Sequence, residues 1–237
     1  MLNNSPYNQE IDFLMSESVK YQYPKDFINK IVCGDCFELI KYIPDKDIDC
    51  IVTDPPYGLN TKGIKNDADL SIFYNILPEC FRVLKEDSFF ITFFSTKFLP
   101  RLFENNPFTY FWQFILYCPE GNVRSPIGFT KYMSCFIFKK GNPKFIKLKT
   151  DIFQDTPGKM VEPDEGFINH PTPKPKHFIK ELLQMTTNEN DLILDPLIGS
   201  GSTVVACKQL SRRFIGFEIN KEYCILANKR LEKIKNI

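Results

Sequence analysis

The chain has 237 residues, of which 43% are hydrophobic and 25% are charged, and its formal net charge at pH 7 is +1. This composition is typical of a globular domain and lacks the strongly basic balance that indicates nucleic-acid binding, although a local basic patch is enough for such binding. No apolar run is long enough to span a bilayer, and acids scattered through residues 1–30 leave no apolar signal core. We therefore expect a cytoplasmic protein without a membrane partner, whose eight cysteines are free thiols.

In the first half of the chain, short apolar runs alternate with amphipathic stretches, as expected for strands that are joined by helices. The apolar runs predict strands at 30–33, 48–53, 88–94, 110–117 and 132–139. The last two of these are expected to form an antiparallel pair. The amphipathic stretches predict helices at 37–43 and 70–84, and a short helix that ends near residue 104.

Residues 141–169 break this alternation, because they are polar, follow no period and are interrupted by proline and glycine, so we expect a loop. The remaining elements are helices at 174–185, 201–210 and 221–234 and strands at 192–194 and 213–217. Asn220 is expected to cap the last helix. The alternation predicts an α/β fold with a doubly wound, mostly parallel sheet of seven strands that includes one antiparallel pair. Residues 30–237 form a single predicted domain, preceded by an extension over residues 1–29.

The strand at 48–53 is followed by Asp54-Pro55-Pro56-Tyr57, which places a carboxylate, two prolines and an aromatic ring at its carboxyl end. Such a group can hold an exocyclic amine between hydrogen-bond acceptors. Tyr57 can then stack on the attached base. The alternative is a purely structural role, in which an acid precedes a diproline turn and Tyr57 is a surface ring over a loop.

Residues 195–203 join a strand to a helix through a turn with two glycines, which let a ligand approach the backbone. Glu218 ends the next strand, where an acid typically accepts hydrogen bonds from ribose hydroxyls, or else caps the closing helix. The pattern predicts half of a nucleoside site. NAD is disfavoured because Val204 replaces the third glycine of its usual motif, and no phosphate-binding lysine follows the glycines, which argues against a P-loop NTPase.

These segments resemble the motifs of S-adenosylmethionine-dependent DNA amino-methyltransferases. Asp54–Tyr57 matches the DPPY motif of the N6-adenine type, and 195–203 resembles Asp-Pro-Phe-x-Gly-Ser-Gly-Thr-Thr, with Leu197 in place of Phe. His170–Pro175 is similar to the family's His-Pro-Thr-Gln-Lys-Pro element, and Gly34-Asp35 to its strand-end Gly-Asp. The catalytic motif precedes the cofactor glycines, as in the circularly permuted beta class. The resemblance therefore implies a Rossmann-like methyltransferase sheet with permuted motif order.

The resemblance implies a site-specific DNA adenine N6-methyltransferase, which transfers a methyl group from S-adenosylmethionine to an adenine flipped out of duplex DNA and needs no metal. An Asp at the first motif position favours adenine in this class, where Ser is more usual for N4-cytosine. The implied catalytic residues are Asp54, Pro55, Pro56 and Tyr57. The implied cofactor-binding residues are Asp35, Cys36, Phe37, Asp54, His170, Thr172, Lys174, Asp195, Pro196, Gly199, Ser200, Gly201, Ser202, Thr203, Glu218 and Ile219. A homodimer and a cognate restriction endonuclease are partners that fit the same context.

Three other functions stay open at this point: a DNA N4-cytosine methyltransferase, an RNA base-amine methyltransferase and a non-catalytic subunit of a modification assembly. Beta-class enzymes usually carry a target-recognition region ahead of the His-Pro-Thr element, yet only the short insert 141–169 is available here. Its Lys144, Lys147 and Lys149 suit either DNA phosphates or a solvated loop. Recognition would otherwise come from a dimer mate, from a partner or from residues 1–29.

Several candidate side chains admit more than one role. His170 has the chemistry of a general base, but the resemblance implies that it shapes its loop, and Lys174 is expected to be a positioning cation. Phe37 can flank the cofactor's adenine or be an ordinary core ring. Asp35 can approach the cofactor or stabilise the start of a helix through its dipole.

Two further groups are less specific. Asn122 and Arg124 lie in the connection after the strand at 110–117, from which they can reach DNA or the flipped base. Cys33 and Cys36 form a lone CxxC motif without a second pair or a nearby histidine cluster. Buried thiols at a strand end are therefore favoured over a zinc or redox site.

Overall fold

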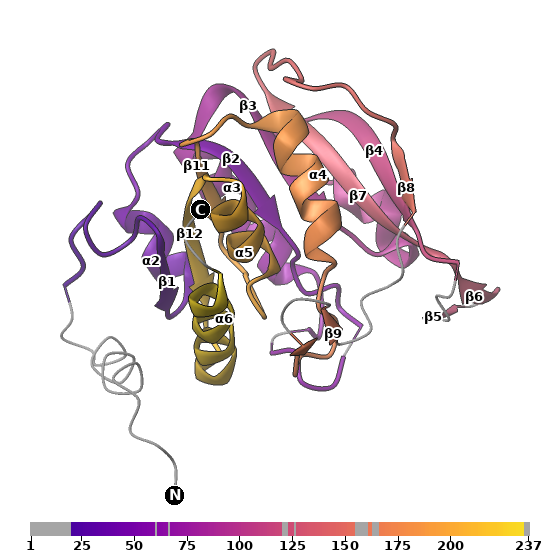
Figure 1. The fold of residues 1–237 in the computed structure, drawn as a ribbon. Coiled ribbons are helices and arrows are strands. Elements are labelled where there is room, and N and C mark those ends of the chain that lie inside the picture. The colour runs from indigo at the N-terminus through magenta and orange to yellow at the C-terminus, as the bar shows by residue number, and fades with distance from the viewer. Residues whose placement is uncertain are drawn as a thin grey trace, which may run out of the picture.

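The computed structural model describes residues 20–59, 61–65, 67–119, 123–125, 127–154, 161–162 and 166–234. A sheet of eight strands forms its centre, in the order β1-β12-β11-β2-β3-β7-β4-β8 (Figure 1). The strands are β1 (Lys30–Cys33), β2 (Ile48–Thr53), β3 (Leu84–Phe93), β4 (Thr109–Tyr117), β7 (Tyr132–Lys140), β8 (Ile152–Gln154), β11 (Leu192–Asp195) and β12 (Arg213–Glu218). The first five in spatial order are parallel, and β7 is antiparallel to both β3 and β4.

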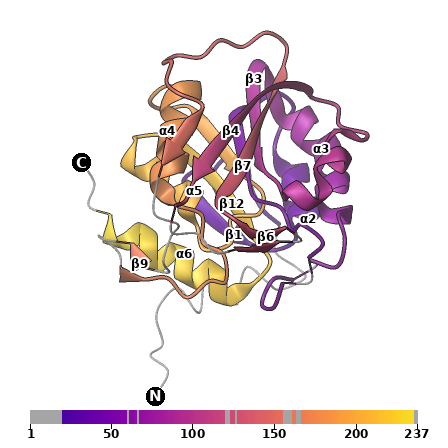
Figure 2. The same ribbon diagram turned by 90° about the vertical axis from the view of Figure 1, so that its right-hand side faces the viewer.

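Helices cover both faces of this sheet (Figure 1 and Figure 2). One face carries α2 (Cys36–Leu39), η1 (Ile40–Tyr42), α3 (Ser71–Val83) and η2 (Thr96–Phe103), and the other carries α4 (Lys176–Thr186), α5 (Ser202–Gln209) and α6 (Lys221–Lys233). Because successive strand residues point to opposite faces, Phe89 and Ile91 pack with α4 while Phe90 packs with α3. Within the described residues, no helix is long and apolar enough to cross a membrane.

The crossover connections place β2 beside β11, and Ile51 pairs in register with Leu194. The chain leaves β2 through α3 on one face of the sheet and leaves β11 through α5 on the other. Because the connections after these neighbouring strands run to opposite faces of the sheet, a crevice opens at the carboxyl ends of the two strands. Asp54, which follows β2, and Asp195, which ends β11, therefore stand at the same edge of the sheet.

The structure confirms the predicted doubly wound α/β fold and the antiparallel pairing of β4 with β7. The prediction of seven strands is wrong, because β8 adds an eighth, parallel to β4, inside the segment expected to be a loop. Only three residues of β8 pair, which is too short a run for an alternating pattern to be visible in the sequence. The same segment also contains the small sheet of β9 (Val161–Glu162) and β10 (Gly166–Phe167).

Two helix ends follow local chemistry. The Asn220 side chain accepts a hydrogen bond from the Glu222 N–H at 2.9 Å, which confirms it as the cap of α6. The predicted helix that ends near residue 104 is the 3₁₀ helix η2, which contains Pro100. Proline has no N–H to donate, so it does not support a continuous α-helical ladder at this point.

The ribbon of β4 and β7 continues beyond the main sheet as a small hairpin, formed by β5 (Val123–Ser125) and β6 (Gly128–Thr130). Between ribbon and hairpin, the Cys118 N–H donates to the Lys131 carbonyl at 2.7 Å. The hairpin therefore extends from the ends of β4 and β7, as Figure 2 shows. The sequence prediction has no strand here.

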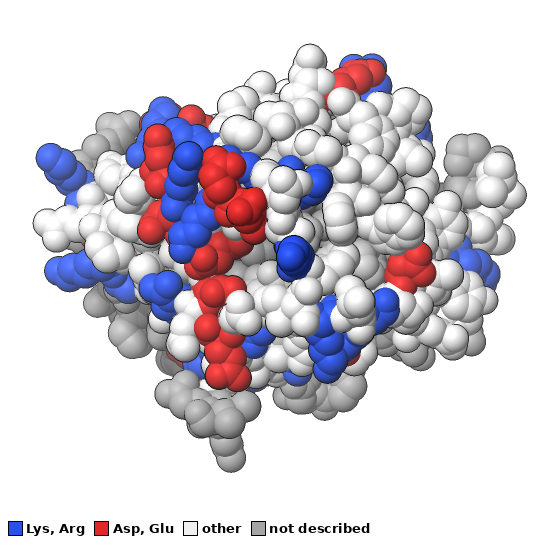
Figure 3. Space-filling view, turned by 90° about the horizontal axis from the view of Figure 1, so that it is seen from above, with Lys and Arg blue, Asp and Glu red and all other residues white. Residues whose placement is uncertain are grey.

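The opposite end of the sheet, where β2 and β3 begin, carries charges of both signs. Lys46 pairs with Glu86 at 3.2 Å, and Lys85 pairs with Asp49 at 2.6 Å. Figure 3, which views the molecule from above, shows Lys and Arg side by side with Asp and Glu. These opposite charges offset one another, so this end is poorly suited to attract a polyanion.

Candidate active site

A cavity of about 850 Å³ lies at the carboxyl ends of the parallel strands. It extends across the ends of β1, β12, β11, β2 and β3 and past the start of the antiparallel β7. The predicted site residues that line it are Asp35, Cys36, Phe37, Asp54, Pro55, Pro56, Tyr57, His170, Thr172, Lys174, Asp195, Pro196, Gly199, Ser200, Ser202, Thr203, Glu218 and Ile219. Among the predicted site residues, only Gly201 is absent from this lining. The fold thus joins segments far apart in the sequence into one cavity.

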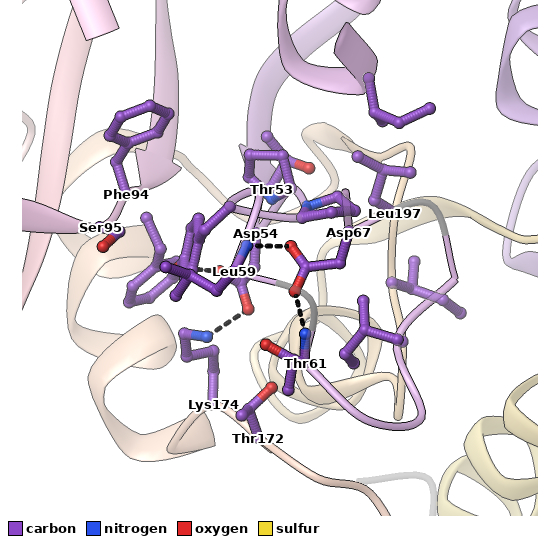
Figure 4. A pocket seen from close by; sticks show the side chains of 18 of the residues that line it. Thr53, Asp54, Leu59, Thr61, Asp67, Phe94, Ser95, Thr172, Lys174 and Leu197 are labelled. Carbon is purple, nitrogen blue, oxygen red and sulfur yellow. Dashed lines mark hydrogen bonds and ion pairs between the residues drawn. The ribbon is translucent and has the colours of Figure 1, made fainter. Parts of the chain in front are cut away.

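The Asp54 carboxylate is held from both sides (Figure 4). Its Oδ1 accepts a hydrogen bond from the Tyr57 hydroxyl, and its Oδ2 accepts one from the Lys174 ammonium. Pro55 and Pro56 follow directly, and because proline cannot donate to a sheet, they end β2 here. The Asp54 side chain keeps 25% of its surface exposed, so the carboxylate faces the cavity rather than the core.

Tyr57 packs at the wall of the same cavity. Its ring meets Phe94 edge to face at a centroid distance of 6.1 Å, and the Lys174 Nζ lies 5.5 Å from its ring centroid. Burial and the adjacent Asp54 carboxylate raise the pKa of the Tyr57 hydroxyl well above its usual value. The hydroxyl therefore keeps its proton and remains a hydrogen-bond donor to Asp54.

Glu218 joins the glycine turn to the start of α6. Its Oε2 accepts the Gly199 N–H at 3.0 Å, and its Oε1 accepts the Asn220 N–H at 2.7 Å. Each carboxylate oxygen can accept a second hydrogen bond, so the group can still serve a ligand. Burial raises the pKa of Glu218 above its usual value, despite these backbone donors.

Asp195 lies beneath the cavity and is only 3% exposed. Its Oδ1 accepts the Leu197 N–H at 3.1 Å, which holds the turn after β11. Burial raises the pKa of Asp195 to about 7, although the neighbouring Thr203 and Thr53 hydroxyls act to lower it. The buried Thr53 hydroxyl nevertheless completes no hydrogen bond of its own within the described residues. Asp195 is thus placed to support the turn from below.

His170 is buried against the glycine turn. Its Nδ1 accepts the Thr172 N–H at 3.2 Å, and its ring contacts Tyr223 at a centroid distance of 4.6 Å. A Cβ on Gly199 would lie 3.0 Å from the His170 Nε2, and Gly199 has a φ of +50°, so only glycine fits well at this position. These contacts favour the loop-shaping role of His170 over that of a general base.

His170 gives the protein an expected loss of stability in acid. Burial lowers its pKa to about 4, so between pH 6.5 and pH 4 the unfolded chain binds a proton that the folded chain does not. This difference should lower the free energy of unfolding by on the order of 3 kcal/mol across that window. Urea unfolding at several pH values gives the free energy of unfolding as a function of pH. Between pH 4 and pH 6.5 this free energy should change less with pH for His170→Gln than for the wild type. Equal slopes for the two proteins would contradict the assignment, since contributions from Asp195 and Glu218 are common to both.

Gly201 contributes by making room rather than by lining the cavity. It has a φ of +83°, and a Cβ there would lie 2.6 Å from the Ala227 Cβ of α6. Glycine thus allows α5 and α6 to approach closely. The glycine pattern in the sequence cannot distinguish this packing role from ligand contact.

Arg230 of α6 is a site residue that the sequence analysis missed. It is 3% exposed, and its Nη1 donates to the Ser200 carbonyl at 2.7 Å and to the Ser200 and Ser202 hydroxyls at 3.3 Å. A cation from the neighbouring helix therefore fixes the turn that lines the cavity. The sequence feature that could have identified Arg230 is its place on the buried side of an amphipathic helix, where an arginine is unusual.

Asp67 is a second missed residue, and it organises the loop after the Asp54 motif (Figure 4). Its carboxylate accepts the N–H groups of Gly58 at 2.7 Å, Leu59 at 3.2 Å and Thr61 at 2.7 Å. Burial pushes its pKa upward, but these hydrogen bonds outweigh that effect and lower it. An ionised Asp67 therefore holds the loop against the cavity.

The segment after β1 combines capping with cavity lining. Asp35 accepts the Phe37 N–H at 2.9 Å and caps α2, so the predicted helix-start role is present alongside its place in the cavity wall. Cys33 packs in the core beneath α4 to α6, whereas Cys36 packs in the core on the α3 side. The two thiols of the CxxC motif thus belong to opposite faces of the sheet. All eight cysteines are buried and free.

Other sequence candidates lie away from the cavity or outside the described residues. Lys149 is ion-paired with Glu181 of α4, and neither it nor Lys144 nor Lys147 lines the cavity. Asn122 lies outside the described residues, and of Arg124 only the backbone, in β5, is described. These three lysines therefore lie away from the strand ends that form the cavity.

The sequence of this chain matches a known protein family and several of its members. Residues 48–150 and 144–229 match the family model N6_N4_Mtase, described as DNA methylase. The chain is 28% identical to the type II methyltransferase M.HpaI of Haemophilus parainfluenzae, over 86% of this chain and 74% of that protein. It is also 28% identical to the DNA adenine methyltransferase YhdJ of Escherichia coli strain K12, over 85% of this chain and 82% of that protein.

Solved structures share the fold. The complex of M1.HpyAVI with SAM (S-adenosylmethionine) has a TM-score of 0.68 at 25% identity and covers 85% of this chain and 98% of its own. The PvuII DNA methyltransferase, which is specific for cytosine N4, has a TM-score of 0.72 at 20% identity and covers 89% of this chain and 90% of its own.

Proposed function

Because this chain belongs to the DNA methylase family, we propose that it methylates the N6 amine of adenine at a specific sequence in duplex DNA. Its cofactor is S-adenosylmethionine, which supplies an electrophilic methyl group on a sulfonium centre. The observation that carries the proposal is the Asp54 carboxylate, held between Tyr57 and Lys174 in the cavity that also contains Glu218.

The residues at the β12 and β11 end of the cavity fit the adenosyl part of the cofactor. Gly199 forms a cradle that a Cβ would fill, and Glu218 presents carboxylate lone pairs suited to ribose hydroxyls. The buried Thr53 hydroxyl, which lines the same cavity near Asp195, offers a further polar contact. A volume of about 850 Å³ lies within the usual range for a cofactor site.

The Asp54 motif would orient the substrate amine. An adenine amine is a weak nucleophile because its lone pair is delocalised into the ring, so catalysis depends on orientation and on stabilising developing positive charge. The Asp54 carboxylate retains lone pairs beyond those used by Tyr57 and Lys174, so it can accept a hydrogen bond from one N–H of the amine. The Pro55 carbonyl would accept a hydrogen bond from the other N–H. These contacts turn the nitrogen lone pair toward the cofactor side.

Tyr57 would hold the flipped base by stacking. A base stacked on an aromatic ring gains about 1–3 kcal/mol, enough to offset much of the cost of leaving the duplex. Lys174 lies over the Tyr57 ring and against Asp54, so it balances the carboxylate charge. This arrangement favours an active enzyme over a non-catalytic subunit.

The choice of adenine has support from both sequence and comparison, but cytosine is the second candidate. Asp54 at the first motif position is typical of adenine enzymes, and one relative is a DNA adenine methyltransferase. The cytosine-N4-specific PvuII enzyme shares the fold, which favours the alternative. A homodimer and a cognate restriction endonuclease remain predictions from the sequence resemblance.

We expect labelled methyl groups from S-adenosylmethionine to appear in duplex DNA as N6-methyladenine. The test incubates the purified protein with duplex DNA and, separately, with RNA, and then separates the nucleosides. N4-methylcytosine as the sole product would overturn the adenine assignment. Preferential labelling of RNA would overturn the assignment of DNA as the substrate.

A further inference from the structure

The hairpin of β5 and β6 carries two exposed apolar side chains at the rim of the cavity. Ile127 is 93% exposed and Phe129 is 61% exposed, and both line the cavity. Ser125 pairs with Gly128, so Ile127 stands in the turn of the hairpin. Short hairpin turns favour glycine, asparagine and aspartate, and an isoleucine exposed to water there adds nothing to the stability of the fold. Its presence therefore points to a partner.

Strand order fixes which part of the cavity the hairpin borders. Glu218 on β12 and Asp195 on β11 lie on one side of β2, which carries Asp54 at its end. On the other side come β3 and then β7, whose first residue follows the hairpin by way of Lys131. The hairpin thus borders the half of the cavity that faces away from the cofactor residues. A base that meets Asp54 from opposite the cofactor must enter through this half.

Positive charge accompanies the apolar side chains. Lys97, which follows β3, and Lys131, which follows the hairpin, are both exposed and both line the cavity. Ammonium groups at such a rim can contact phosphates on either side of an extruded nucleotide. Apolar and cationic side chains on the wall of one cavity match the stacked bases and the phosphates of a DNA strand.

We propose that the β5–β6 hairpin is a wedge that enters duplex DNA at the target site, with Ile127 filling the gap that the flipped base leaves in the stack and Phe129 supporting it at the rim. This rests on the proposed function, because it requires a DNA substrate from which a base is extruded. Extrusion leaves neighbouring bases unstacked, and an inserted apolar side chain recovers part of that contact. The same insertion removes Ile127 from water.

The test uses Ile127→Ser and the wild type on two duplexes that carry the recognition sequence, as identified by methylation sequencing of DNA from expressing cells. One duplex is fully paired, and the other has an abasic site opposite the target base, which lowers the cost of flipping. We expect kcat/KM of Ile127→Ser to fall about tenfold or more on the paired duplex and to recover most of that loss on the abasic one. Phe129→Ala should show the same pattern to a smaller extent.

Leu148→Ser is the matched control, because Leu148 is 80% exposed but does not line the cavity, and it should behave as the wild type on both duplexes. With 2-aminopurine at the target position, the wild type should raise its fluorescence on binding, and Ile127→Ser should raise it less. Unchanged kcat/KM for Ile127→Ser on the paired duplex, or an equal loss on both duplexes, would overturn the wedge while leaving the proposed function intact. If the wild type methylates no DNA, the proposed function fails and the wedge fails with it.

Discussion

Asp54→Ala is expected to lower kcat for methyl transfer by about 10³-fold or more while cofactor binding is retained. The substitution removes the acceptor that is proposed to orient the substrate amine and to stabilise its developing charge, an interaction that matters most in the transition state. The proposed cofactor contacts come chiefly from the turn at Gly199 and from Glu218, which belong to other strands. Single-turnover kinetics with labelled cofactor, together with calorimetry of cofactor binding, measure the two effects separately.

Asp45→Ala provides a control for this substitution. Asp45 precedes β2 at the far end of the strand from Asp54, and its exposed side chain pairs only with Arg82 among the described residues. Exposed ion pairs contribute little, so both kinetics and binding should stay at wild-type values. Methyl transfer by Asp54→Ala at near the wild-type rate would remove this residue from the chemistry, and with it the proposed mechanism.

The central fold and most of the site were accessible from the sequence because they depend on strong local signals. The apolar run before Asp54 and the glycine turn after Asp195 each mark a strand end, and parallel strands bring their carboxyl ends to one edge. Two strand ends with complementary chemistry therefore predict one site. The sequence also shows that the Asp54 motif precedes the glycine turn, which is the order expected for the permuted arrangement.

The residues that were missed act through tertiary contacts. Arg230 lies on a helix whose sequence does not reveal that its buried side meets the turn at Ser200. Asp67 looks like an ordinary loop acid until the backbone N–H groups of Gly58, Leu59 and Thr61 converge on it. Neither contact produces a periodic pattern in the sequence, because each depends on how two segments meet in space.

The hairpin and β8 escaped prediction for a different reason. Both consist of three-residue strands, and β8 depends on tertiary contacts: it pairs with the edge of β4, and its Phe153 packs against Phe114 and Phe178. In such short segments, neighbouring strands decide the conformation more than intrinsic propensity does. Exposed residues such as Ile127 also contradict the usual hairpin preferences, so the local signal points away from the structure that forms.

Glu218→Gln is expected to weaken binding of S-adenosylmethionine by about 10- to 100-fold, although the substitution is nearly isosteric. Each carboxylate oxygen accepts one backbone N–H, from Gly199 and from Asn220. An amide has a single acceptor oxygen, so in either orientation its NH₂ group opposes one of these donors and displaces the turn or the start of α6.

Calorimetric titration with S-adenosylmethionine measures this loss, and thermal unfolding without cofactor shows whether the fold persists in Glu218→Gln. Glu222→Gln is the matched control, since Glu222 lies in the first turn of α6 with its side chain exposed, and its cofactor affinity should equal that of the wild type. At saturating cofactor, Glu218→Gln should regain most of the wild-type kcat, because Asp54 is still held by Tyr57 and Lys174. The opposite result, a low kcat with unchanged affinity, would show that Glu218 acts in the chemical step. Substitutions of Asp54 and Glu218 therefore test the two halves of the cavity separately: we expect the first to change turnover and the second to change cofactor affinity.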